Sequence, residues 1–193
     1  MIKEEILPFT LISPEVGFII FPRIFDLLED NHNAKIILIP HELSDKSINY
    51  YQKQASRKNL SSIVIEDYID LSSLKEQIII INTVGILYKL YWQAHISYIG
   101  GGFSKNGIHN IMEPAVASNP IIFGPNYSNG NFSEAEELLS TSAAFTINSD
   151  LELIEVFEKL NDISIYDLAS TSARNVMENN IGSTSKLLSS ILA

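Results

Sequence analysis

The chain has 193 residues, of which 46% are hydrophobic and 19% are charged, a composition typical of a globular domain rather than a disordered chain. Its formal net charge of −10 argues against nucleic acid as a partner, and the absence of cysteine excludes disulfides and thiolate metal sites. We expect no membrane insertion, because no apolar run approaches the roughly 20 residues of a membrane-spanning helix, and we expect no signal peptide in the opening MIKEEILPF.

Short apolar segments alternate with helical segments along the first 148 residues. Several of the apolar segments lack polar alternation, as is typical of strands that are covered on both faces. This order predicts an α/β fold with a mostly parallel sheet and helices on both faces. The strands are predicted at 9–13, 35–39, 62–66, 78–82, 96–100, 120–124 and 143–147, and the helices near 15–30, 44–58, 85–92, 110–118 and 132–140.

The remainder of the chain contains no further strand pattern. Helices are predicted at 149–160, 163–180 and 183–192, and Ser149 or Asp150 is the expected N-cap of the first of them. We therefore expect a single domain over residues 1–193, with a strand and helix core at about 9–148 and a helical extension at about 149–193.

A glycine-rich stretch, YIGGGFSKNGIHNIMEP at 98–114, follows the fifth predicted strand. Ligands of parallel sheets bind where a strand ends and the chain enters the next helix, and we expect that helix to begin near His109–Asn110. Glycine permits close approach of a ligand, and the N–H groups at a helix start suit a phosphate or a carboxylate. The Walker and Rossmann fingerprints both fail here, since Ile108–His109 and Lys105 stand where those motifs need other residues.

His109 and Glu113 are four residues apart and are predicted to share a helix face. Three interpretations remain open at this point. His109 is a cap and Glu113 is a solvated acid near a helix start, or Glu113 accepts hydrogen bonds from vicinal hydroxyls, or the two bind a metal. The metal ranks last because a third ligand is missing, and we expect no metal site.

Residues 100–139, GGGFSKNGIHNIMEPAVASNPIIFGPNYSNGNFSEAEELL, resemble the signature region of 3-deoxy-D-manno-octulosonic acid (Kdo) transferases, most of all the Bacteroidetes branch. That family shows Gly-Gly, then a Gly-His-Asn-Pro-Leu-Glu-Pro-like run, a Pro-led strand, Gly-Pro and a Phe-x-Glu-Ala helix. LIPHEL at 38–43 and NTVGILYKLYWQAHISYIGG at 82–101 are similar to two further family segments.

The resemblance implies one Rossmann-like half of a GT-B glycosyltransferase, namely the C-terminal half that holds the donor CMP-Kdo. The lipid A precursor and the catalytic base then belong to an N-terminal half that this fragment lacks. We therefore expect no catalytic residue and no cofactor in this chain. The full-length protein is expected to serve lipopolysaccharide biosynthesis at the cytoplasmic face of the bacterial inner membrane.

The resemblance also implies which residues contact the donor. Pro40–His41 match a Pro-Arg pair that touches CMP, Val84–Gly85–Ile86 match a Met-Gly-Glu segment beside the nucleotide, and Glu113 matches the partner of the ribose. Gly101 and Gly102 are expected to leave space for the donor, and Lys105 or His109 to stabilise the departing phosphate. The full expected donor site is Pro40, His41, Val84, Gly85, Ile86, Gly101, Gly102, Lys105, His109, Asn110, Ile111, Met112, Glu113 and Glu134.

Two departures from the family pattern keep alternatives open. His41 replaces the family arginine, and Ile86 replaces the family glutamate. The chain is alternatively a domain of another GT-B sugar-nucleotide enzyme, such as a UDP-sugar transferase or epimerase, or a diverged non-catalytic nucleotide-binding module. Tyr88, Tyr91 and Trp92 form an aromatic cluster on one predicted helix, and we interpret it as core packing.

Overall fold

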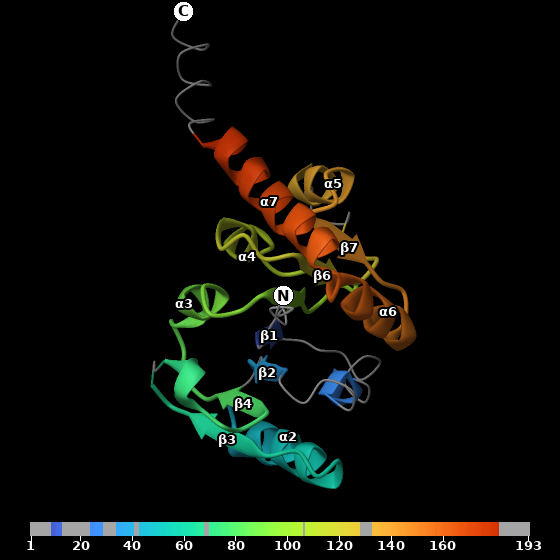
Figure 1. Cartoon of the computed structure of the whole chain (residues 1–193). Coiled ribbons are helices and arrows are strands. Elements are labelled where there is room, and N and C mark those ends of the chain that lie inside the picture. Colours follow the sequence, from blue (N-terminus) through green and yellow to red (C-terminus); the bar gives the residue numbers. More distant parts are fainter. Residues whose placement is uncertain are drawn as a thin grey trace, which may run out of the picture.

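A computed structural model describes residues 9–12, 24–28, 34–40, 43–67, 70–105, 107–127 and 133–181, with 9–12 described by their backbone alone. Within these residues, seven strands form one sheet in the order β3-β4-β2-β1-β5-β6-β7 (Figure 1). Every neighbouring pair in that sheet is parallel. The strands are β1 (Phe9–Ile12), β2 (Lys35–Leu38), β3 (Ser62–Ile65), β4 (Ile78–Ile81), β5 (Ile96–Ile99), β6 (Ile121–Phe123) and β7 (Ala144–Thr146). All predicted strands are present, so the α/β fold class is confirmed.

Helices alternate with the strands and then close the chain. They are η1 (Phe25–Leu28), α2 (Asp45–Arg57), η2 (Leu71–Ser73), α3 (Leu87–Tyr91), α4 (Met112–Val116), α5 (Ser133–Ser140), α6 (Asp150–Leu160) and α7 (Ile163–Asn180). Ser149 is the N-cap of α6, as expected, because its side chain accepts a hydrogen bond from the Glu152 amide at 3.2 Å. The helix expected at 15–30 lies mostly outside the described residues, and the one expected at 183–192 lies wholly outside them.

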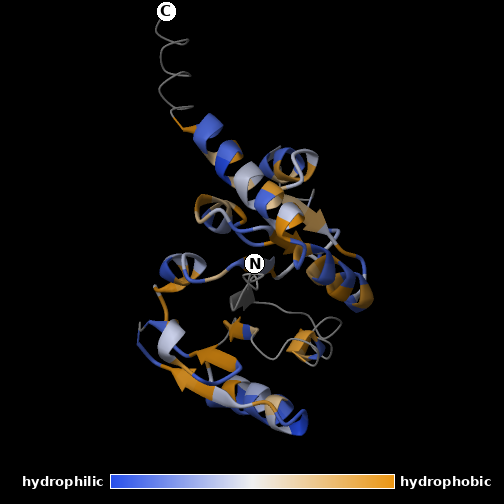
Figure 2. Ribbon diagram, viewed as in Figure 1, coloured by the Kyte–Doolittle hydropathy of each residue, from blue (hydrophilic) through white to orange (hydrophobic). Residues whose placement is uncertain are grey.

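Both faces of the sheet are covered, as the apolar strands predict. α3, α4 and α5 bury one face, with Tyr91, Ala115 and Leu138 in its core, and α2 and α6 bury the other, with Ile48 and Phe157 in its core. Figure 1 shows α3 and α4 on the opposite side of the sheet from α2 and α6. Strands in hydrophobic colours and helices of mixed colour in Figure 2 agree with this layering.

The helices expected as a terminal extension are part of this packing. α7 packs against α4, α5 and α6. Its residue Ala169 joins the core on one face of the sheet, whereas Ala173 and Val176 join the core on the other. α7 therefore ties the two layers together beside the β6 and β7 end of the sheet. No helix in the described part of the chain is both long and apolar enough to span a membrane.

The strand order fixes where a ligand site belongs. The chain passes from β1 to β2 on one side of β1, continues to β3 and β4, and then crosses to β5 on the other side of β1. In open parallel sheets, ligands bind outside the carboxyl ends of the strands at such a reversal. The reversal lies between β1 and β5, and the segment that follows β1 is outside the described residues. The segments that leave β5 and the neighbouring strands β2 and β4 share this edge and are the candidates, and α3 is the helix that joins β4 to β5.

One buried polar side chain connects α3 to the sheet. Asn119 is 2% exposed, and its Nδ2 donates to the Tyr91 carbonyl oxygen at 2.9 Å and to the Ser97 hydroxyl at 3.0 Å. Tyr91 ends α3, and Ser97, itself fully buried, lies on β5. Because buried polar groups need partners, Asn119 satisfies both groups and holds the end of α3 against the sheet.

We predict that Asn119→Ala lowers the free energy of unfolding by about 1–3 kcal/mol, because it leaves the Tyr91 carbonyl and the Ser97 hydroxyl without this donor. Urea unfolding followed by circular dichroism measures the loss. Asn161→Ala, at an exposed position after α6, is the control and should stay within about 0.5 kcal/mol of the unsubstituted chain. Equal stability of the two variants would contradict the role given to Asn119.

Candidate functional site

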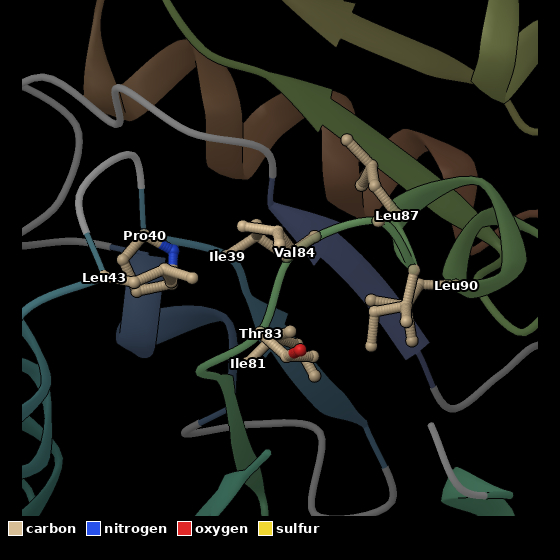
Figure 3. Close-up of a pocket in the computed structure, with 10 residues that line it drawn as sticks. Ile39, Pro40, Leu43, Ile81, Thr83, Val84, Leu87 and Leu90 are labelled. Atoms are coloured by element: carbon tan, nitrogen blue, oxygen red, sulfur yellow. The ribbon is translucent and has the colours of Figure 1, made fainter. Parts of the chain in front are cut away.

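The carboxyl ends of β2 and β4 enclose a pocket together with the start of α3. Its volume is about 200 Å³. Figure 3 shows Pro40 and Leu43 at one end of the pocket, Leu87 and Leu90 at the other, and Thr83 between them. Thr83 supplies the polar side chain of this otherwise apolar lining, which consists of Ile39, Pro40, Leu43, Ile81, Thr83, Val84, Gly85, Ile86, Leu87 and Leu90.

Four of the predicted donor-binding residues meet in this pocket. Pro40 follows β2, and Val84, Gly85 and Ile86 follow β4, so the pairing of these two strands brings distant segments together. Val84 is 81% exposed at the pocket's edge. Gly85 has φ of +80°, and no atom lies within 4 Å of the place that a Cβ would take. The chain at 83–86 therefore offers backbone groups to a ligand. His41 lies outside the described residues.

The glycines after β5 have a structural reason that the sequence did not reveal. A Cβ on Gly101, whose φ is +88°, would lie 2.3 Å from the Gly107 carbonyl oxygen. A Cβ on Gly102 would lie 2.6 Å from the Gly124 nitrogen. Both glycines are buried, so the space that a side chain would need there is filled by the chain's own backbone. The interpretation that their missing side chains leave room for a donor is corrected on this point.

The helix after this loop starts later than expected. α4 begins at Met112 and has five residues, so the prediction of a helix from His109–Asn110 is wrong. The His109 amide donates instead to the Gly100 carbonyl at 3.3 Å, and the Met112 amide donates to Asn110 Oδ1 at 2.9 Å. Two N–H groups that we expected to face an anion are therefore already used. His109 precedes the helix, so it does not share a helix face with Glu113.

Glu113 lies at the start of α4 and is held by Asn110. The Asn110 side chain is exposed, and its Nδ2 donates to Glu113 Oε1 at 3.0 Å. Glu113 is half-buried, and its backbone lies in the first turn of α4. One oxygen of this carboxylate is therefore hydrogen-bonded within the chain while part of the side chain stays accessible, which suits an acceptor for ligand hydroxyls.

The other predicted residues of this stretch divide by burial. Ile111 is 1% exposed and belongs to the core beneath α3 and α4, so its side chain does not face a ligand. Met112 is half-buried, and Lys105 is exposed on the loop. The imidazole of His109 is half-buried and packs beside Gly101, with its Cδ2 at 3.4 Å from the place of a Cβ there.

The predicted residues thus form two groups at one edge of the sheet. Pro40 and residues 84–86 line the pocket, whereas residues 101–113 surround the end of β5. α3 contacts α4, and Ile86 packs against the core that contains Ile111, which keeps the groups adjacent. Glu134 is not among the pocket residues; it lies in the first turn of α5, half-buried, with its carboxylate accepting from the Ser133 hydroxyl at 3.3 Å.

Sequence reasoning missed part of the pocket and misjudged part of α3. Thr83, Leu43 and Leu87 line the pocket. Thr83 lies just after β4 and Leu87 starts α3, which is a signal that could have identified them, whereas Leu43 precedes α2 and has no such signal. Of the aromatic cluster, only Tyr91 is buried; Tyr88 is 55% exposed and Trp92 is 65% exposed, so the core interpretation is wrong for these two. Among the described residues, His, Asp and Glu side chains form no group of three or more that could hold a metal ion.

Similar proteins support the fold and the family resemblance. No family model matches the chain. A 3-deoxy-D-manno-octulosonic acid transferase of Rickettsia bellii is 34% identical over 180 residues, covering 93% of this chain and 41% of the relative. A second such transferase, of Rickettsia felis, is 36% identical over 79% of this chain and 32% of the relative. The chain therefore spans about two fifths of the length of the first relative and about one third of the second. These relatives confirm the resemblance to Kdo transferases. The prediction of a Bacteroidetes-like version is not tested by them and stays a prediction.

A solved structure shows the same fold. The C-terminal CMP-Kdo binding domain of WaaA from Acinetobacter baumannii matches with a TM-score of 0.73 at 17% identity, covering 90% of both chains. At this identity the match shows the fold alone, and it is the fold of one half of a GT-B protein. The expected fold is therefore confirmed at the level of a GT-B half.

We predict that Gly102→Ala destabilises the chain by at least about 3 kcal/mol, because the new Cβ would meet the Gly124 backbone at 2.6–2.7 Å and force the two segments apart. Gly85→Ala is the matched variant. It has open space and a positive φ, so it should cost only about 1–2 kcal/mol of backbone strain. Thermal unfolding measures both, and a smaller loss in Gly102→Ala than in Gly85→Ala would refute the close backbone contact.

Proposed function

This chain is a homologue of the Kdo transferases, and we propose that it is the half of such an enzyme that binds the sugar nucleotide CMP-Kdo. The observation that carries the proposal is the convergence of the described residues of three separate family-like segments, 38–40 with 43, 82–86, and 100–105 with 107–113, on one edge of a parallel sheet. The homology over 93% of the chain supports it. The proposal includes a lipid A precursor as the acceptor and the cytoplasmic face of the inner membrane as the place of action.

The pocket suits one portion of a nucleotide. Its volume of about 200 Å³ lies below the roughly 300–1,000 Å³ of pockets that enclose a whole drug-sized ligand. Its walls are apolar, and they match a flat ring such as cytosine. Thr83 and the backbone at 84–86 supply the polar groups that distinguish one base from another. Recognition of the base by backbone groups also explains how Ile86 can replace the glutamate of the family pattern.

The second group of residues faces the rest of the nucleotide in this proposal. The Glu113 carboxylate accepts hydrogen bonds from the ribose hydroxyls. Lys105, exposed on the loop, and His109, beside Gly101, are the candidates to contact the phosphate. A positive charge there stabilises the negative charge that grows on CMP as the bond to the sugar breaks.

The reaction of the whole enzyme would divide between two halves. An acceptor hydroxyl attacks the anomeric carbon C2 of Kdo, the bond from C2 to the phosphate oxygen breaks, and CMP leaves. This chain contributes the orientation of the donor and the stabilisation of the leaving phosphate. The base that takes the proton of the attacking hydroxyl belongs, by this proposal, to the part of the relatives that this chain does not cover, since it spans 41% of the Rickettsia bellii protein.

The runner-up is a UDP-sugar enzyme. The solved structure of Anabaena Alr3699/HepE in complex with UDP-glucose matches the fold with a TM-score of 0.59 at 12% identity. This likeness concerns the fold alone. Whether the pocket binds cytosine or uracil distinguishes the CMP-Kdo-binding half from a UDP-sugar enzyme. The third alternative, a diverged non-catalytic module, would bind a nucleotide or nothing and would take part in no transfer.

We predict that the chain binds CMP more tightly than UDP, and that Glu113→Ala weakens CMP binding roughly 10- to 100-fold through loss of a charge-assisted hydrogen bond. Isothermal titration calorimetry measures both. Glu152→Ala is the matched control, because Glu152 also accepts from an asparagine side chain, Asn148, but far along the chain on α6. Tighter binding of UDP would favour the runner-up, and equal CMP affinity for the two variants would remove Glu113 from the site.

We also predict that this chain alone does not transfer Kdo from CMP-Kdo to a lipid A precursor, because by this proposal the base and the acceptor site belong to the part of the relatives that the chain does not cover. Mass spectrometry of the lipid after incubation measures transfer, with a full-length relative as the positive control. Turnover by the isolated chain would show that it contains its own base.

A further inference from the structure

We infer that Asn110 is a positioning residue: it orients the Glu113 carboxylate for the sugar nucleotide and does not itself contact the ligand. This inference rests on the proposed function. It reassigns Asn110, which the sequence marked as one of several donor contacts, on the basis of where its side-chain atoms point.

Both ends of the Asn110 amide are engaged within the chain. Its Oδ1 accepts a hydrogen bond from the Met112 amide at 2.9 Å, and its Nδ2 donates to Glu113 Oε1 at 3.0 Å. Two bonds in opposite senses fix the plane of the amide and exclude a flipped arrangement, because a flip would place a donor against the Met112 amide and an acceptor against a carboxylate. The side chain is otherwise exposed, so these two bonds decide its orientation.

The hydrogen bond from Asn110 Nδ2 orients the Glu113 carboxylate. In the described part of the chain, Asn110 is the side chain that hydrogen-bonds Glu113. A free glutamate at a half-buried position loses rotamer freedom when a ligand binds, and this loss weakens binding. Glu113 is ordered beforehand, and Oε1 has one lone pair occupied while Oε2 remains for a hydroxyl of the ligand.

A local structural role for Asn110 is the competing explanation. The bond from the Met112 amide to Asn110 Oδ1 acts as a cap from one residue before the N-cap position, Ile111, whose own side chain makes no cap bond, and such a bond stabilises the start of a helix whether or not a ligand binds. Aspartate caps about as well as asparagine, because it keeps the acceptor oxygen. Aspartate has no N–H to donate to Glu113, however, and it would place a second negative charge beside that carboxylate. Asn110→Asp therefore keeps the cap and removes the positioning bond.

The test uses CMP as the probe, with calorimetry for affinity and thermal unfolding for stability. We expect Asn110→Asp to unfold within about 2 °C of the unsubstituted chain, since the cap is kept, and to bind CMP at least about tenfold more weakly. In a Glu113→Ala background the same substitution should cause no further loss. Asn148→Asp is the matched control, because Asn148 Nδ2 donates to Glu152 Oε2 at 3.1 Å in the same kind of pair, and it should leave CMP affinity unchanged.

The outcomes separate this inference from the proposed function. Full CMP affinity in Asn110→Asp overturns the inference, and so does an equal loss in the Glu113→Ala background, which would show that the substitution acts on CMP binding by a route other than Glu113. Side-chain NMR of the ligand-free chain provides an independent measurement. A single Glu113 rotamer that becomes averaged in Asn110→Asp supports positioning, and an averaged rotamer in the unsubstituted chain refutes it whether or not CMP binds. If Glu113 has a single rotamer but the chain binds no CMP, the proposed function is wrong. The role of Asn110 and Glu113 in binding a nucleotide is then wrong as well.

Discussion

Burial of both faces of a parallel sheet is the constraint on which this molecule depends. β4 shows it most clearly, since its residues Ile78–Ile81 are at most 1% exposed. Because helices must cover both faces, each strand is followed by a crossover, and every crossover begins at the same edge of the sheet. That edge is where the pocket lies and where the chain after β5 turns back on itself. The position of the site thus follows from hydrophobic burial, while its chemistry comes from a few loop residues.

Those loop residues are held by backbone contacts and by asparagine side chains. The Gly102 backbone lies against Gly124, which fixes the segment after β5 beside the segment after β6. Asn119 ties the end of α3 to β5 from within the core, and Asn110 fixes the carboxylate of Glu113 at the surface. A ligand that enters this edge meets backbone groups and oriented side chains that are already in place, so less freedom is lost on binding.

The fold was predictable from the sequence because strands that are buried on both faces consist of continuous β-branched runs, such as Ile78–Ile81. The start of α4 was not predictable from these rules. Ile108 and Ile111 are both buried, and their spacing of three residues suits a helix, but the residues between them are not helical, and the His109 amide donates to the Gly100 carbonyl instead. The family resemblance identified Pro40 and residues 84–86, which the structure brings together, but no pattern revealed Leu43, because loops carry no periodicity. Helical spacing alone also could not tell the buried Tyr91 from the exposed Tyr88 and Trp92.

The central claim is that the pocket between β2 and β4 and the segment that ends at Glu113 form one site for a cytidine nucleotide. NMR titration of the labelled chain with CMP tests this most directly, because each backbone amide reports its own binding curve. The account predicts that amides at 83–86 and at 109–113 shift together and fit one dissociation constant. Shifts confined to one of the two segments, or two segments that titrate with different constants, would contradict it.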